Sequence, residues 1–206
     1  VPGATATFIS VPFVDAGVVE VFGFSGTWTW QDTLIASTIT TNFGRAVDIN
    51  GDTIVAANLS AGVSTGAYVF DGSSGWVDQQ NHEEFPAPDR AGAWLGDTLV
   101  LGSSKDDYLA NPDAGAINSY SRNGGSWDYD GKQHADDATA GAGFGTSIAL
   151  FGDQLLVGAP GDGEAALNAG AAYLFKQVAG TWVQRGKILT NDAELDDALG
   201  GGSPTA

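Results

Sequence analysis

Three short segments concentrate the side chains that could do chemistry, and nearly all of these side chains are carboxylates. The segments are KDDYLANPD (105–113), GDGEAALN (161–168) and NDAELDD (191–197). Their candidate metal ligands are Asp106, Asp107, Asp113, Asp162, Glu164, Asp192, Glu194 and Asp196. Calcium is bound in proteins by such carboxylates together with backbone carbonyls, so the pattern predicts Ca²⁺ as an assisting ion. No segment has complete EF-hand spacing, and the alternative is a set of solvated acidic loops that keep the protein soluble.

Other catalytic patterns are weak. GAGFGTS (141–147) resembles a nucleotide loop only superficially, because a strand rather than a helix is expected after it and it carries no lysine. The two histidines, His82 and His134, follow their nearest upstream tryptophans by six and seven residues, which predicts exposed repeat positions rather than catalytic bases. No G-x-S-x-G motif is present. A glycoside hydrolase with paired carboxylates remains a less favoured hypothesis, and we expect no catalytic residue and no enzyme.

Charge and composition narrow the class of partner. The 206 residues include 25 acidic against 8 basic side chains, for a formal net charge of −17. This balance disfavours nucleic acid, whose binding depends on Lys and Arg contacts to phosphates. No apolar run approaches the roughly 18 residues of a membrane span, and the absence of cysteine excludes disulfides and zinc–thiolate sites. We therefore expect a protein or glycan ligand rather than nucleic acid or a membrane span.

The acidic segments belong to an internal repeat. The dipeptide Gly-Asp occurs at 51–52, 96–97 and 152–153. It is followed by an Ala-Gly or Thr-Gly step and an apolar run that ends in an aromatic residue, as in AGAAYLF (169–175), AGAINSY (114–120) and TGAYVF (65–70), with AGVVEVF (16–22) as another copy. A tryptophan follows each closing aromatic, at Trp28, Trp76, Trp127 and Trp182, with spacings of 48 to 55 residues. This period is typical of β-propeller blades.

Each copy predicts four antiparallel strands, so the fold class is all-β. In the last copy the strands are expected at about 145–151, 154–159, 170–176 and 181–189. The Gly-Asp pair predicts a type I′ hairpin turn, because both of its residues would need positive φ. The run LLV (155–157) has no polar alternation, which predicts a strand buried on both faces. Gly158 aligns with Gly102, Ala57 and Ser10, and we expect small residues there because the inner strands of a propeller converge.

The repeat resembles the FG-GAP repeats of the integrin α-subunit head and of bacterial surface proteins. Phe144-Gly145 and Gly158-Ala159-Pro160 carry the family name, and the resemblance is looser in the other copies, such as Phe43-Gly44 with Ala57-Asn58-Leu59. It implies a β-propeller of four-stranded blades, used outside the cell for adhesion or ligand binding. The D-x-D-x-D-G calcium loop of integrin blades is missing, because a bare Gly-Asp turn stands in its place. The chain is therefore similar to the bacterial variety, and the calcium residues of the family cannot be transferred to it.

Propeller topology would place most of the acidic residues on one face. The loops between the second and third strands share a face with the links between blades, whereas the tight turns lie on the other. Fifteen acids fall on or near the long-loop face: Asp15, Glu83, Glu84, Asp89, Asp106, Asp107, Asp113, Asp136, Asp137, Asp162, Glu164, Asp192, Glu194, Asp196 and Asp197. Ligands commonly bind at such loops.

These features predict a single propeller domain or propeller segment over 1–206, with repeats at about 1–40, 41–88, 89–140 and 141–195. Residues 196–206 are either the start of a further repeat or a strand that completes the first blade, with Leu199-Gly200 in the Phe-Gly position. The first residue, Val1, is not an initiator Met, which suggests a mature or excised chain. The final GGSPTA is a poor strand sequence, which favours further blades or subunits in a larger assembly.

The expected function is a non-enzymatic extracellular or cell-surface binding and adhesion module, with its ligand at the acidic long-loop face and with calcium assisting. The alternative is a structural spacer within a larger secreted enzyme or surface filament.

Overall fold

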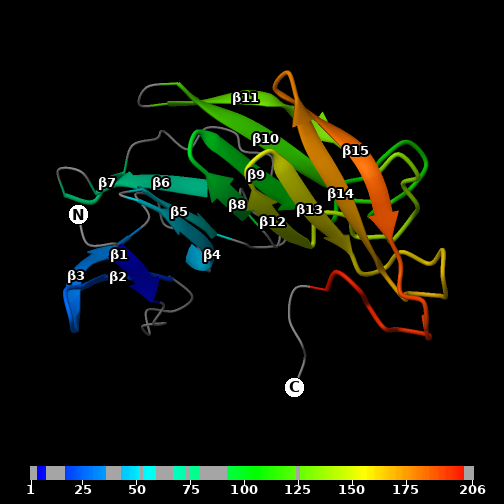
Figure 1. The fold of residues 1–206 in the computed structure, drawn as a ribbon, viewed down its shortest axis with the longest axis horizontal. Helices are drawn as coiled ribbons and strands as arrows, with labels where there is room; N and C mark the ends of the chain where they lie inside the picture. Colours follow the sequence, from blue (N-terminus) through cyan, green and yellow to red (C-terminus); the bar gives the residue numbers. More distant parts are fainter. Residues whose placement is uncertain are drawn as a thin grey trace. The chain divides into compact units, whose positions relative to one another are not determined.

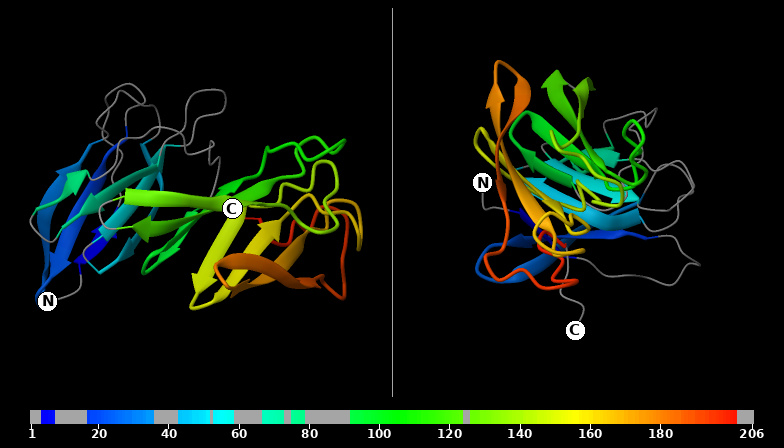
Figure 2. Two further views of the ribbon diagram at one scale, coloured as in Figure 1. Left: turned by 90° about the horizontal axis from the view of Figure 1, so that it is seen from above. Right: turned by 90° about the vertical axis from the view of Figure 1, so that its right-hand side faces the viewer.

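The described part of the chain consists of β-strands and the turns between them, without a helix. In the computed structural model the described residues are 4–7, 17–35, 43–51, 53–58, 67–72, 75–78, 92–123 and 126–201. They form four antiparallel sheets (Figures 1 and 2). The predicted all-β class with four-stranded antiparallel sheets is confirmed. Over the described ranges, no helix is present that could cross a membrane.

The chain divides into two compact units, Val1–Ala87 and Pro88–Ala206. The first unit contains a three-stranded sheet, β1 (Ala4–Thr7), β2 (Val19–Phe24) and β3 (Trp28–Leu34). It also contains a four-stranded sheet, β4 (Phe43–Asn50), β5 (Thr53–Asn58), β6 (Ala67–Asp71) and β7 (Val77–Asp78). The second unit contains β8 (Gly92–Leu95), β9 (Thr98–Ser103), β10 (Ala116–Asn123) and β11 (Ser126–Gln133). Its last sheet is β12 (Ser147–Phe151), β13 (Gln154–Ala159), β14 (Ala171–Val178) and β15 (Thr181–Ile188).

Strands that follow one another along the chain pair within each sheet, and each sheet lies within one of the predicted repeat ranges. Whether the four sheets form one closed ring stays a prediction.

The hairpin turns differ from the predicted type. Gly51, Gly96 and Gly152 have φ near +60°, whereas Asp97 and Asp153 do not share a positive φ. A type I′ turn needs positive φ at both central residues, but a type II′ turn needs it only at the first. The described Gly-Asp pairs at 96–97 and 152–153 therefore fit type II′, and the type I′ prediction is wrong for them. Asp52 lies outside the described residues.

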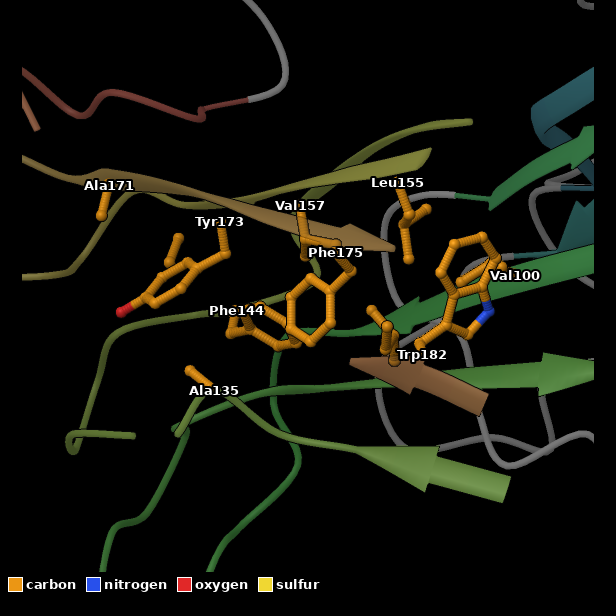
Figure 3. Packing of buried hydrophobic residues seen from close by; sticks show 11 residues of the cluster. Val100, Ala135, Phe144, Leu155, Val157, Ala171, Tyr173, Phe175 and Trp182 are labelled. Atoms are coloured by element: carbon orange, nitrogen blue, oxygen red, sulfur yellow. The ribbon is translucent and has the colours of Figure 1, made fainter. Parts of the chain in front are cut away.

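Each unit has a core between its two sheets. In the second unit, Val100 and Ile117 of sheet β8–β11 pack with Leu155, Val157 and other side chains of sheet β12–β15, and all four are essentially inaccessible (Figure 3). Phe144 lies in this core with its ring 5.3 Å from that of Tyr173 and 5.7 Å from that of Phe175. In the first unit, Val19 and Val21 of β2 pack with Ile54 and Phe70 of the following sheet.

Some glycines of the repeat are required where the backbones of successive repeats approach each other closely. A Cβ on Gly102 would lie 2.0 Å from the carbonyl oxygen of Gly145, and one on Gly158 would lie 2.2 Å from that of Gly200. Gly115 forms a parallel bridge with Phe144, and Gly170 forms the same bridge with Leu199. The small residue predicted at position 158 is thus required locally by the backbone that begins the next repeat. Ser10, its predicted counterpart, lies outside the described residues.

Candidate functional site

One lysine gathers three carboxylates from two connecting segments of the second unit. The ammonium of Lys187, on β15, lies 2.7 Å from Asp137 Oδ2, 2.9 Å from Asp162 Oδ2 and 2.8 Å from Glu164 Oε2. Asp162 and Glu164 belong to the loop between β13 and β14, and Asp137 to the link between β11 and β12. The ammonium also lies 5.1 Å from the centre of the Tyr173 ring. We call Lys187, Asp137, Asp162 and Glu164 the Lys187 cluster.

Local backbone contacts fix the position of Asp162 at the start of its loop. Its amide donates to the Ala159 carbonyl and its own carbonyl accepts from the Gly170 amide. Oδ1 of Asp162 accepts from the Glu164 amide at 3.0 Å, a short Asx-type contact that turns the chain. Tyr173, directly opposite Lys187 in the sheet, donates its hydroxyl to Asp162 Oδ2 at 2.9 Å. Asp162, only 2 % exposed, is thus satisfied on both oxygens.

The electrostatics favour the ionised forms of Asp162 and Lys187. Burial raises the pKa of Asp162, but hydrogen bonds from Lys187, the Glu164 amide and Tyr173 lower it by more, so the pKa lies below its ordinary value. Burial lowers the pKa of Lys187, but hydrogen bonds to Asp137, Asp162 and Glu164 outweigh it and raise this pKa. Burial, the largest cause, raises the pKa of Tyr173. Three carboxylates and one ammonium leave the Lys187 cluster with net negative charge at neutral pH.

A pocket of about 550 Å³ opens beside the Lys187 cluster. Its walls include Asp137, Glu164 and Lys187, the glycine backbone at 161 and 163, and the side chains of Leu167 and Asn168. Leu167 is 67 % exposed. The pocket therefore offers charged acceptors and amide donors together with the apolar side chains of Ala140 and Leu167. Such a combination can orient a polar ligand by several hydrogen bonds.

The preceding repeat contains a related contact. Lys132 of β11 donates to Asp106 Oδ2. Asp106 occupies the position of Asp162, because its amide and carbonyl make the corresponding bonds to Ser103 and Gly115. Lys132 and Lys187 each follow the tryptophan of their repeat by five residues. The lysine–aspartate pair is thus a feature of the last two repeats.

His134 lies beside the Lys132–Asp106 pair, and its exposure is lower than predicted. Its ring stacks on Tyr108 at 4.0 Å, Nδ1 lies 3.0 Å from the Gly115 carbonyl oxygen, and Nε2 lies 3.8 Å from Asp106 Oδ1. The side chain is 16 % exposed rather than fully exposed. His82 lies outside the described residues.

The other candidate ligands are scattered in pairwise contacts. Asp107 Oδ1 accepts from the Asp113 amide at 2.9 Å, and Asp113 lies 3.6 Å from the Lys105 ammonium. Asp196 accepts from the Asn168 side chain at 2.9 Å. The Glu194 side chain and Asp192 are exposed. Of the eight candidates, only Asp162 and Glu164 meet in one cluster, and the described residues contain no group of three acidic or histidine side chains arranged for a metal.

Sequence reasoning missed Lys187 and Tyr173 as partners of Asp162. The signal was present, because the last two repeats align Lys187 with Lys132 and Asp162 with Asp106. A search for acidic residues alone overlooked it. Four acids of the predicted long-loop face, Asp15, Glu83, Glu84 and Asp89, lie outside the described residues.

Comparison with known families agrees with the repeat. Together, the fold and the cluster define an all-β repeat protein with a polar pocket among its connecting loops. Residues 127–175 match the family model described as FG-GAP repeat. This segment contains Phe144-Gly145 and Gly158-Ala159-Pro160, so the predicted resemblance to FG-GAP repeats is confirmed. That the chain is of the bacterial variety stays a prediction.

Among solved structures, the chain is similar to a fungal lectin from Aleuria aurantia, described as a six-bladed β-propeller with a novel mode of fucose recognition. The identity is 11 %, the TM-score is 0.43, and the alignment covers 85 % of this chain and 54 % of the lectin chain. The chain thus spans about half the length of that protein. No curated protein matches the chain.

Proposed function

We propose that this chain is a non-enzymatic binding module of the β-propeller type, and that its ligand binds in the pocket beside Lys187. The observation that carries the proposal is the pocket itself, because it joins loops of successive repeats around a cluster of fixed charges. The ammonium of Lys187 pairs with three carboxylates and thereby fixes their positions beside the pocket. Such preorganised groups lose little freedom when a ligand arrives.

A glycan is the ligand class that we propose for this pocket. Sugar hydroxyls both donate and accept hydrogen bonds, as serine and threonine hydroxyls do. The pocket supplies carboxylate acceptors at Asp137 and Glu164, an amide at Asn168 and an apolar contact at Leu167. A nucleic acid would meet net negative charge there, which opposes phosphate binding. We also propose that the module acts outside the cell or at its surface, as FG-GAP repeats commonly do.

Calcium assistance stays a prediction. The three carboxylates that converge do so on the Lys187 ammonium, which already neutralises part of their charge. Calcium takes six to eight oxygen ligands, and the remaining described candidates are too scattered to supply them. The described residues therefore do not fit a calcium centre without displacement of Lys187.

A glycan array probed with the purified chain tests the proposal, and the matched variants Leu167→Asp and Leu195→Asp locate the site. Both leucines are exposed, at 67 % and 63 %, but only Leu167 lines the pocket. We expect neutral oligosaccharides to bind, Leu167→Asp to weaken binding by at least about tenfold, equivalent to about 1.4 kcal/mol, and Leu195→Asp to bind normally. Equal loss in both variants, or no binding on the array, would contradict the proposal.

The alternative role as a structural spacer is favoured by the junctions at Gly102 and Gly158, which serve to join repeats. In that case no ligand would protect the pocket. Hydrogen exchange of the loop 160–170 with and without the best array glycan separates the two functions, since only a binding site gains protection.

A further inference from the structure

The last described sheet exposes several large apolar side chains, together with Gln154 and Lys176, on the face turned away from its core. In β9, Leu99, Val100 and Leu101 are all buried, as the prediction for such runs requires, and Val100 faces sheet β12–β15. In β13 the same run is Leu155, Leu156 and Val157, but Leu156 is 39 % exposed. Leu156 stands where Val100 stands in the preceding sheet. The run 155–157 is therefore buried on only one face of its strand, and the prediction that it is buried on both faces is wrong.

Other large apolar side chains share this face with Leu156. Register places Leu156 beside Leu174 of β14, and Leu174 beside Gly186 of β15. Strand alternation then puts Phe151, Val183 and Ile188 on the same side. Their exposed fractions are 83 %, 38 % and 50 %. We call Phe151, Leu156, Val183 and Ile188 the Leu156 face.

A second face with exposed aromatic side chains lies on the described part of sheet β1–β3. Val19 and Val21 of β2 point into the core of the first unit, so Phe24 points to the opposite side. Trp28 pairs with Phe24 in register, and their rings lie 5.0 Å apart. Phe24, Trp28 and Trp30 are 45 %, 54 % and 58 % exposed. We call these three residues the Trp28 face.

The core of the second unit shows what covers such faces. Trp182 has the repeat position of Trp28, and it is only 3 % exposed because it packs in the core that contains Val100 (Figure 3). Val100, in turn, has the repeat position of Leu156. The aromatic face of one sheet thus packs on the aliphatic face of another. The Trp28 face and the Leu156 face carry the residues of the two halves of this same kind of contact, and in the described residues they are exposed.

We propose that the Leu156 face binds the Trp28 face of a second copy of this chain, in a head-to-tail contact. Each copy carries both halves, as a heterologous interface requires. The backbone near the Leu156 face is already arranged for a following sheet, because Leu199 bridges Gly170 as Phe144 bridges Gly115. Sheet β1–β3 is three-stranded in its described part. The contact therefore continues the order of sheets seen within each unit.

Sedimentation velocity of the intact chain tests the proposal. The chain concentration is varied from about 1 to about 100 µM, the order of magnitude of the dissociation constants of weak contacts. We expect the mass to rise above the 21.0 kDa of one copy as concentration increases. Trp28→Lys and Leu156→Lys should each reduce this growth, because each buries a charge in an apolar contact. Leu195→Lys is the control, since Leu195 is also exposed, at 63 %, but belongs to neither face.

Mixing the two variants distinguishes the head-to-tail contact from a symmetric one. Leu156→Lys keeps an intact Trp28 face and Trp28→Lys keeps an intact Leu156 face, so an equimolar mixture should regain a two-copy complex. If the mixture stays at the mass of one copy while wild type associates, the contact is not head-to-tail. A wild-type chain of single-copy mass at every concentration overturns the proposal. If, in addition, both variants lower the melting temperature of such a single-copy chain, the two faces meet within one chain instead. Far-UV circular dichroism confirms that each variant is folded.

Discussion

The ammonium of Lys187 lies between three carboxylates that differ sharply in exposure. Asp162 is almost fully buried, at 2 %, whereas the Glu164 side chain is 59 % exposed. Water can solvate Glu164 if the lysine is lost, but it cannot reach Asp162. The same ammonium therefore contributes very differently to the stability of its partners.

Replacing the two carboxylates separately should reveal this difference. Asp162→Asn leaves Lys187 paired with Asp137 and Glu164 but removes the buried negative charge that accepts hydrogen bonds from Lys187, Tyr173 and the Glu164 amide. Because hydrogen bonds to charged groups are among the stronger ones, we expect a loss of about 3 kcal/mol. Glu164→Gln should cost less than about 1 kcal/mol, as exposed ion pairs do. Urea unfolding at neutral pH measures both changes. Equal losses would show that burial does not control the strength of these pairs.

The pH dependence of stability should follow from the same residues. The pKa of Asp162 is lowered in the folded state, so its stabilising contribution is complete above the unfolded value of about 3.9 and is lost as pH falls through the folded value. The pKa of Lys187 is raised, so its contribution is complete below about 10.4 and is lost as pH rises through its folded value.

The free energy of unfolding of wild type and Asp162→Asn, measured from neutral pH downward, tests the acid limb. The difference between them should be largest near neutrality and should shrink as acid protonates Asp162 in the wild type. A difference that stays constant down to the most acidic condition would contradict the lowered pKa.

At the scale of elements, the junction between successive repeats depends on glycine backbone. Gly145 has φ +92°, and a Cβ there would lie 2.4 Å from the Ala116 carbonyl oxygen. Gly152 also has positive φ, at +59°, but a Cβ there would meet nothing within 4 Å. The two glycines share the conformational requirement and differ in the close approach of the backbone.

Alanine substitutions at these two glycines therefore separate the cost of backbone strain from the cost of a steric clash with neighbouring backbone. Gly152→Ala should cost about 1–2 kcal/mol, from positive-φ strain alone. Gly145→Ala should cost at least about 3 kcal/mol, because overpacking adds to the strain. Thermal unfolding monitored by circular dichroism measures both. Similar losses at the two positions would mean that the junction yields to the added methyl group.

The strands were predictable from sequence because their signals are local. The expected strand at 154–159 coincides with β13, and the others in that repeat differ by no more than about two residues at each end, the ordinary uncertainty of strand limits. The Lys187 cluster was only half predictable. Asp162 and Glu164 are neighbours in sequence, but Lys187 reaches them through pairing of β14 with β15 and a fold-specific loop. No local pattern encodes that convergence, although alignment of the repeats marks it.

At the scale of the whole molecule, a net charge of −17 acts against compactness. Salt screens such repulsion, with a Debye length of about 10 Å at 0.1 M ionic strength. We therefore expect the melting temperature to rise when sodium chloride is added to a low-salt buffer. A gain of about 1 kcal/mol would correspond to about 2–4 °C for a chain of this size.

Calcium chloride at matched ionic strength turns this experiment into a test of specific metal binding. Since the Lys187 ammonium holds the converging carboxylates, we expect the Lys187 cluster of the wild type to add no rise that is specific to calcium. Lys187→Met removes the ammonium and leaves Asp137, Asp162 and Glu164 close together, so this variant should gain an additional rise with calcium that a chelator reverses. An additional rise in the wild type would instead support calcium binding at carboxylates other than those held by Lys187. If neither protein distinguishes the two salts, the three carboxylates do not form a calcium site even without the lysine, and their role is confined to orienting Lys187 and the pocket beside it.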